Sequence, residues 1–203
     1  MGIVSGVTTN PTFLKAQTFI SSLSYLKNIV TVLEQLAHPI PFNVQVMTNN
    51  PAQMIQQAEL LATELSYKEL VIKIPCGWEQ LGVINALAKN GTVINCTACI
   101  TVGQVVLAAE AGARYVSLFL GKAQDAGADA ETLIQHCVRG LYYAKCETEL
   151  VVGSLRSSAD VEAAILAGAH IVTVRTKILK QLSKHSKTEE AITAFSNDYV
   201  PLK

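Results

Sequence analysis

The stretch ELVIKIP, residues 69–75, decides the fold, because it reads as a strand whose two faces differ. Successive residues of a strand point to opposite faces, so Leu70, Ile72 and Ile74 form one wholly apolar face. Lys73 lies on the other face. An ammonium group is costly to bury, so Lys73 must either reach solvent at the rim or serve as a neutral amine.

The rest of the chain alternates between such strands and helices. Residues 50–65 begin with Asn50 and Pro51, a helix cap and first-turn pair, and residues 157–170 offer Ser158 as a cap and Gly168 at the far end. Alternating strands and helices predict a parallel sheet. Strands are expected in the β-branched or apolar runs at residues 2–9, 42–47, 70–75, 92–98, 115–120, 150–154 and 170–174.

The polarity of one strand face favours a closed barrel over an open, doubly wound sheet. Helices cover both faces of an open sheet, so both faces would be apolar. Here one face repeatedly becomes polar near the C-terminal ends of the strands, where a barrel places its site. We therefore expect an α/β fold of the TIM (β/α)8-barrel type, with only seven strands evident, as a single domain over residues 1–203.

Composition limits the partners of this domain. Lys plus Arg and Asp plus Glu both number 16, so no net charge favours nucleic acid or an anionic membrane. The longest uncharged run, residues 90–109, contains polar residues and glycine, which argues against a transmembrane segment. The five cysteines lack the spacing of a disulfide framework, so we expect a cytoplasmic protein. A small phosphorylated metabolite remains a suitable ligand.

If the polar faces converge, their side chains surround one cavity. Lys73 would there be desolvated, and a neutral amine is the nucleophile that forms a Schiff base with a carbonyl. Arg156 offers a planar fork for a phosphate, with the Ser154 hydroxyl beside it. The expected cavity residues are Thr9, Asn10, Gln45, Lys73, Asn95, Thr97, Ser117, Phe119, Ser154 and Arg156.

Cys96 and Cys99 have the C-x-x-C spacing of many metal and redox sites. The alternation of the strand puts Cys96 on the side of the helices, and no second cysteine pair in the sequence completes a zinc site. We interpret both residues as packed, reduced thiols and expect no metal site.

Five motifs, in this order and spacing, resemble the transaldolase family, in particular its short microbial branch, which also contains fructose-6-phosphate aldolase. The resemblance covers residues 6 to about 199. The tandem of GVTTNP and KIP is specific to that family. The motifs are GVTTNPT (6–12), IKIP (72–75), INCTACIT (94–101), YVSLFLGK (115–122) and VVGSLRSSADVEAAILAGAHIVTV (151–174).

The resemblance implies a Schiff-base mechanism without metal or organic cofactor, acting on sugar phosphates. Lys73 matches the Schiff-base lysine, and Thr97 and Gln45 match positions that hold the catalytic water. Asn10, Asn95 and Ser117 match ligands of the dihydroxyacetone hydroxyls. Ser154 and Arg156 match the phosphate grip, and Lys122 stands where the family usually has an arginine. The resemblance also implies a homo-oligomer, a pentamer or decamer, in which the C-terminal helix packs on a neighbouring subunit.

The resemblance leaves three activities open. Phe119 and Arg156 resemble transaldolases, which favours transfer of a dihydroxyacetone unit within the pentose phosphate pathway. Gln45 resembles the fructose-6-phosphate aldolase side, which is the alternative. Family members begin with a strand of the type LDTA, whose aspartate takes part in proton transfer, and this chain starts after it. A catalytically impaired relative that binds sugar phosphates is therefore the third possibility.

Overall fold

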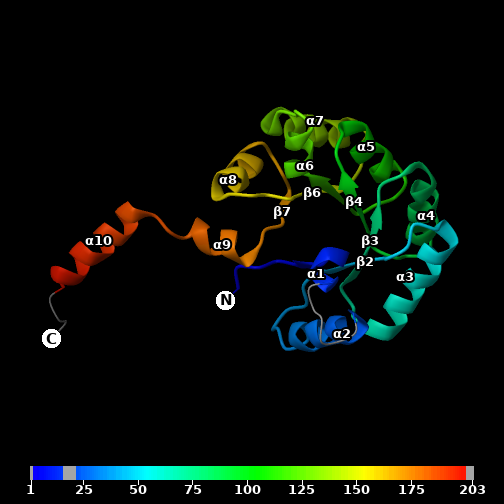
Figure 1. Cartoon of the computed structure of the whole chain (residues 1–203), viewed down its shortest axis with the longest axis horizontal. Coiled ribbons are helices and arrows are strands. Elements are labelled where there is room, and N and C mark those ends of the chain that lie inside the picture. The colour runs from blue at the N-terminus through cyan, green and yellow to red at the C-terminus, as the bar shows by residue number, and fades with distance from the viewer. Residues whose placement is uncertain (1, 16–21, 200–203) are drawn as a thin grey trace.

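The structure is a computed structural model that describes residues 2–15 and 22–199. Seven strands form one parallel sheet whose spatial order, β1 to β7, is also their order in the sequence. The sheet curls, and the helices that connect its strands lie around its outer side (Figure 1). The predicted α/β fold of the barrel type is confirmed in the form of a seven-stranded, curled half-barrel.

All seven predicted runs contain a strand. The strands are β1 (Val7–Thr8), β2 (Phe42–Gln45), β3 (Leu70–Pro75), β4 (Ile94–Cys99), β5 (Tyr115–Phe119), β6 (Glu149–Gly153) and β7 (Ile171–Val172). The described helices are α1 (Pro11–Lys15), α2 (Ser22–Leu33), α3 (Pro51–Leu65), α4 (Trp78–Lys89), α5 (Val102–Glu110), α6 (Leu120–Asp125), α7 (Ala130–Tyr143), α8 (Ser158–Leu166), α9 (Thr176–Leu182) and α10 (Ser186–Asn197).

The first and last strands of the sheet approach each other at their C-terminal ends. The hydroxyl oxygens of Thr8, at the end of β1, and Thr173, just after β7, lie 2.9 Å apart and share a hydrogen bond. The curl of the sheet thus brings the ends of all seven strands around one mouth.

The two faces of the sheet differ as the alternation predicts. Ile72, Ile74 and Ile94 are at most 1% exposed and belong to the apolar core between the sheet and its helices. The buried polar side chains of the strands, among them Lys73 and Asn95, occupy the inner face, since they alternate with that core. The inner face therefore carries the functional groups, and the outer face supplies the packing.

Strand β4 contains a bulge. Cys96 pairs with Val116 and Cys99 with Leu118, so three steps along β4 oppose only two steps along β5. Ala98, inside this interval, has a left-handed backbone with φ of 64°. One extra residue in the strand reverses the alternation, so Cys96 and Cys99 both belong to the core on the side of the helices.

Helix α8 begins one residue earlier than predicted. Ser157, not Ser158, is the cap, because its side chain accepts a hydrogen bond from the Asp160 backbone N–H while the Asp160 carboxylate accepts one from the Ser157 N–H. The acidic residue three positions after Ser157 completes this reciprocal pair. The predicted ends at Asn50, which caps α3, and at Gly168, with φ of 95°, are confirmed.

The two serines give a stability test. We expect Ser157→Ala to lower the free energy of unfolding by about 1 kcal/mol, because the N–H of Asp160 loses its acceptor. The control Ser158→Ala, in the first helical position, should change it by no more than about 0.5 kcal/mol. Urea unfolding of both variants measures the difference, and equal effects would contradict the assignment of the cap.

Helix α10 extends away from the sheet and its surrounding helices (Figure 1). It has no buried residue, and Ile192 and Phe195 are 57% and 72% exposed. Across the described residues, every helix is too short or too polar to span a lipid bilayer.

Candidate active site

A cavity of about 940 Å³ opens among residues at and beyond the C-terminal ends of the strands. Seven of the predicted site residues line it: Thr9, Asn10, Lys73, Ser117, Phe119, Ser154 and Arg156. Gln45, Asn95, Thr97 and Lys122 do not line it. The convergence of the inner strand face, predicted from alternation, therefore brings most of the expected residues to one place.

Lys73 is the most unusual group of this cavity. It is only 5% exposed, and its Nζ donates a hydrogen bond of 3.0 Å to the Thr9 carbonyl oxygen. No carboxylate in the described part of the chain forms an ion pair with it. Burial lowers the pKa of Lys73 from 10.5 to about 8, because desolvation disfavours the ammonium form. The alternative of a rim lysine that reaches solvent is wrong.

A buried network of hydrogen-bonded side chains, two amides and a hydroxyl, lies beside Lys73. Asn95, opposite Lys73 on the next strand, donates from Nδ2 to Asn43 Oδ1 at 2.8 Å. The Ser117 hydroxyl donates to Asn95 Oδ1, also at 2.8 Å. Asn43 was not among the predicted site residues, although it shares a strand face with Gln45. These hydrogen bonds fix the orientation of the Asn43 and Asn95 side-chain amides, and Ser117, which lines the cavity, is held by the second of them.

The segment after β1 contacts the Lys73 amine through Thr9. Thr9 is 6% exposed, and its N–H and its hydroxyl both donate to the Asn43 carbonyl oxygen, at 2.9 and 3.0 Å. This pair of bonds positions the Thr9 carbonyl that receives the Lys73 amine. Asn10 follows, and its Oδ1 accepts from the Phe13 N–H at 3.0 Å, so it caps α1 while it lines the cavity.

Thr97 and Gln45 flank Lys73 from neighbouring strands. Gln45 lies opposite Lys73 in β2, and Thr97 lies opposite Pro75 in β4. Thr97 is 1% exposed, and its hydroxyl oxygen has no hydrogen-bond partner among the described residues. A buried hydroxyl that lacks a hydrogen bond favours the binding of a polar partner, such as a water or a substrate group.

A cationic end of the cavity is built from β6, the segment after it and α6. The Arg156 guanidinium donates to the Gly121 carbonyl oxygen at 3.0 Å and to Asp125 Oδ2 at 2.7 Å. The hydrogen bond and charge of Arg156 lower the pKa of the Asp125 carboxyl, and Asp125 in turn raises the pKa of Arg156. Ser154 lies two residues before Arg156 and has a left-handed backbone, with φ of 61°.

The close contact of α6 with the segment after β6 depends on Gly121. A Cβ atom at Gly121 would lie 2.5 Å from the Ser154 carbonyl oxygen and 3.0 Å from Arg156 Nε. Glycine therefore permits the approach that orients the Arg156 side chain.

Lys122, the neighbour of Gly121, is exposed, and its Nζ lies 4.0 Å from Asp125 Oδ2. It is thus linked to Arg156 through a shared carboxylate and does not face the cavity.

The segment after β7 adds cavity residues that the sequence interpretation did not include. Arg175 is a second guanidinium there and lies over the Phe13 ring at 5.9 Å. The basic pair Arg175 and Lys177, which follows the predicted strand run at residues 170–174, was the available signal.

One cluster outside the cavity has the residue types of a metal site. The sulfur atoms of Cys76, Cys96 and Cys99 lie within 4.8 Å of one another, and among the described residues no other such group of three occurs. The interpretation of Cys96 and Cys99 as packed thiols did not include Cys76 as a third member.

The fold and the cavity together define an α/β-barrel protein with a buried, neutralisable lysine and a nearby arginine at the C-terminal mouth. The chain matches the family described as transaldolase/fructose-6-phosphate aldolase over residues 1–201. It belongs to this family.

Curated relatives that match nearly the whole chain support this family membership. A probable transaldolase of Thermoanaerobacter sp. is 35% identical over 98% of this chain and 88% of its own length. Probable transaldolases of Clostridium acetobutylicum and Parvibaculum lavamentivorans are 36% and 34% identical, again over 98% of this chain and over 89% and 88% of theirs.

Solved structures support the fold alone. The solved structures of two mandelate oxidase variants, one with 2-hydroxy-phenylacetamide and one with a monooxide FMN adduct, are similar to this chain with TM-scores of 0.53 and 0.54. They are 14% and 15% identical, and each match covers 73% of this chain but only 51% of the mandelate oxidase chain, about half its length.

Proposed function

We propose that this protein is a transaldolase that transfers a dihydroxyacetone unit between sugar phosphates through a Schiff base on Lys73. The neutral amine attacks the C2 ketone of a substrate such as fructose 6-phosphate, and loss of water gives the Schiff base. Loss of the C4 hydroxyl proton and cleavage of the C3–C4 bond release an aldose phosphate and leave an enamine. The enamine carbon then adds to the carbonyl carbon of a second aldose phosphate, and water releases the product.

The burial of Lys73 carries this proposal. An amine whose pKa is lowered to about 8, in an apolar strand and without an ion-pair partner among the described residues, has a substantial neutral fraction near neutral pH. Its hydrogen bond to the Thr9 carbonyl aims the nitrogen along the inner face of the sheet. A packing role alone would be better filled by an apolar side chain, because the buried ammonium form destabilises the fold.

The neighbouring polar groups have matching roles. Thr97 and Gln45 would hold the water that carries protons during Schiff-base formation, since the Thr97 hydroxyl is buried and has no hydrogen-bond partner in the part of the chain that the structure describes. Asn10, Asn95 and Ser117 would bind the hydroxyls of the dihydroxyacetone unit. Thr9 would orient the lysine, and Phe119 would form part of the apolar wall.

The phosphate would bind at the cationic end. Arg156 and Ser154 would donate to the phosphate oxygens, and Lys122 would add positive charge from the surface. The Arg156 side chain is 55% exposed, so its remaining donors are accessible. Asp125 keeps the guanidinium in position, but it also reduces the net positive charge that a phosphate meets.

Two further parts of the proposal concern the setting of the enzyme. All five cysteines are free thiols, which supports a reducing, cytoplasmic location. A role in the pentose phosphate pathway is part of the proposal because the proposed substrates are sugar phosphates. The exposed apolar side chains of Ile192 and Phe195 in α10, and of Tyr199 just after it, support a homo-oligomer in which this helix packs on another subunit.

Trapping with cyanoborohydride and fructose 6-phosphate tests the proposal. We expect an adduct of the mass of dihydroxyacetone, mapped to the peptide of Lys73. Its rate should rise between pH 6 and about 8 and then level off, because the neutral fraction of the amine grows until the pH exceeds its pKa. Intact mass and peptide mapping measure it.

The acceptor distinguishes the activities. If erythrose 4-phosphate removes the dihydroxyacetone unit from Lys73 before reduction, the result supports transaldolase. If the unit is released faster without an acceptor, the result supports the fructose-6-phosphate aldolase alternative, which Gln45 beside Lys73 favours. A folded protein that forms no adduct would refute both and support the third possibility, a relative that binds sugar phosphates without catalysis.

A further inference from the structure

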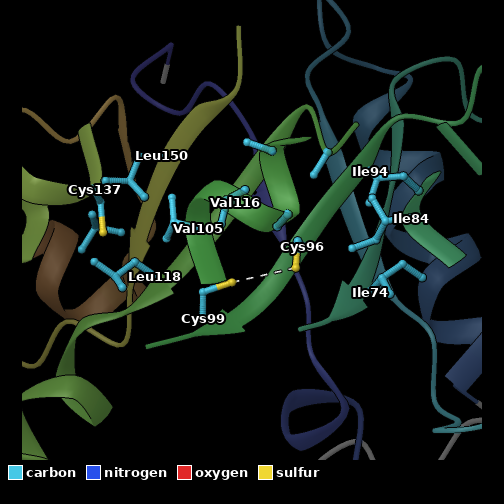
Figure 2. Packing of buried hydrophobic residues seen from close by; sticks show 14 of the residues in the cluster. Ile74, Ile84, Ile94, Cys96, Cys99, Val105, Val116, Leu118, Cys137 and Leu150 are labelled. Carbon is cyan, nitrogen blue, oxygen red and sulfur yellow. Dashed lines mark hydrogen bonds between the residues drawn. The ribbon is translucent and has the colours of Figure 1, made fainter. Parts of the chain in front are cut away.

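Three thiols, one from the segment after β3 and two from β4, converge outside the cavity. Cys96 and Cys99 belong to β4, and their sulfur atoms lie 3.8 Å apart (Figure 2). Cys76 follows β3 directly, and all three sulfur atoms lie within 4.8 Å of one another. Cys96 and Cys99 are fully buried, and Cys76 is half-buried. We call Cys76, Cys96 and Cys99 the thiol cluster.

The backbone is shaped so that these thiols meet. In a regular strand, residues three apart point to opposite faces. The bulge between Cys96 and Cys99, with the left-handed Ala98 inside it, puts both side chains on one face. The Cys76 N–H donates to the Thr97 carbonyl oxygen at 2.8 Å, which joins the third cysteine to the bulged segment. Bulges of this kind commonly re-aim side chains at functional sites.

Two helices begin close to the thiol cluster in the sequence. Helix α4 begins two residues after Cys76 and has no side-chain cap, so its terminal N–H groups add positive potential. Helix α5 begins three residues after Cys99. A negative cluster of sulfurs is thus partly compensated.

The number of donors selects the metal. We propose that the thiol cluster is a three-coordinate site for a soft d¹⁰ cation, and specifically for Cu(I). Metal–sulfur bonds of about 2.3 Å place sulfur atoms roughly 4 Å apart around a common ion, close to the 3.8 Å between Cys96 and Cys99. Structural zinc takes four ligands, and the described residues offer no fourth His, Cys, Asp or Glu in the group.

Binding requires only small movements and a path for the ion. Cys76 is the half-buried member and the one that must move, by up to about 1 Å, because its sulfur lies within 4.8 Å of the others whereas a shared ion requires roughly 4 Å. Cu(I) would enter beside Cys76 and displace the thiol protons into the buffer. Ile74, Val105 and Val116 lie around the two inner sulfurs, so the bound ion would be kept from water and oxidants (Figure 2).

Anaerobic competition for Cu(I) tests the site. The fully reduced chain is mixed with Cu(I) bound to the chelator bicinchoninate, and the colour of the chelate is followed. We expect one Cu(I) transferred per chain, with a sulfur-to-copper charge-transfer absorption in the ultraviolet and X-ray absorption that reports three sulfur neighbours. This readout depends on no catalytic activity, so it succeeds or fails separately from the proposed transaldolase function.

Single substitutions distinguish the cluster from other thiols. Cys76→Ser, at the half-buried position, should weaken Cu(I) binding on the order of 100-fold or more, because one of three ligands is lost. Cys76→Ala should do the same. Cys146→Ser is the matched control, because Cys146 is half-buried like Cys76 but lies outside the cluster. Its circular dichroism and its Cu(I) binding should both stay unchanged.

Three results would overturn the proposal. The first is no transfer of Cu(I) to a reduced, folded chain. The second is equal binding in Cys76→Ser and the unmodified protein. The third is tight one-to-one binding of Zn²⁺ with no binding of Cu(I), which would mean that a fourth ligand is present.

Discussion

Lys73→Met should abolish the adduct with fructose 6-phosphate and at the same time make the protein more stable. The adduct is lost because Lys73 is the lysine that lies beside Thr9 and Asn95 among the described residues. Stability increases because the buried amine, whose pKa falls from 10.5 to about 8, opposes folding while it is protonated. That pKa difference corresponds to about 3 kcal/mol, and the lost hydrogen bond to Thr9 reduces the gain to about 2 kcal/mol.

The sign of the pH dependence follows from the same pKa. Below about pH 8 the folded state must carry the ammonium, so the unsubstituted protein shows the full cost. Between about pH 8 and 10.5 the folded amine loses its proton while the unfolded one keeps it, so the cost declines. The advantage of Lys73→Met in free energy of unfolding should therefore be largest at pH 7 and small at pH 10, as measured by urea unfolding at both.

Lys177→Met is the matched control for this variant. Lys177 lines the same cavity but is exposed, so its removal should keep the adduct and change the stability by less than about 0.5 kcal/mol. A Lys73→Met protein that is less stable than the unsubstituted one at pH 7 would show that the folded state accommodates the charge, and the lysine would not be a desolvated amine.

Gly121→Ala should weaken the binding of phosphorylated substrates at least about tenfold. A methyl group at this position would lie 2.5 Å from the Ser154 carbonyl oxygen, so α6 and the segment after β6 must separate. That movement shifts Arg156, and a charge-assisted hydrogen bond is worth about 1.5–3 kcal/mol, which is tenfold or more in affinity. The measurement is the fructose 6-phosphate concentration that gives half-maximal trapping.

Two comparisons make this test specific. Gly82→Ala, an exposed glycine within α4 with open space around it, should leave the half-maximal concentration unchanged and stabilise the helix by about 1 kcal/mol. Unphosphorylated dihydroxyacetone, which does not reach Arg156, should be trapped equally by Gly121→Ala and the unsubstituted protein. Equal loss with both substrates would place the damage at Lys73 and not at the phosphate grip.

Alternation along the strands made most of the fold predictable. The two-residue period of runs such as residues 70–75 fixes which side chains face the helices, and β3 has that arrangement. The helix start at Ser157 was missed because two adjacent serines both satisfy the general pattern. Only the position of Asp160, three residues after Ser157, distinguishes them.

The candidate site was less predictable where distant segments meet. Lys73, Asn95 and Ser117 followed from the alternation, whereas the pairing of Arg156 with Asp125 depends on how closely α6 approaches the segment after β6. The bulge at Ala98 requires a left-handed alanine, for which the sequence carries no signal. Without the bulge, Cys96 and Cys99 point apart, so the thiol cluster could not be predicted.

The hydrogen bond between Thr8 and Thr173 has a consequence for the order of folding. It joins residues 165 positions apart, whereas every strand pair of the sheet joins neighbours in the sequence. Closing a long loop costs more chain entropy than closing a short one, so contacts between neighbouring strands are the cheaper ones to form early. We expect the sheet to grow strand by strand along the chain, and its two outer strands to meet only in the final step. The mouth that carries Lys73 would then be the last part of the molecule to become native.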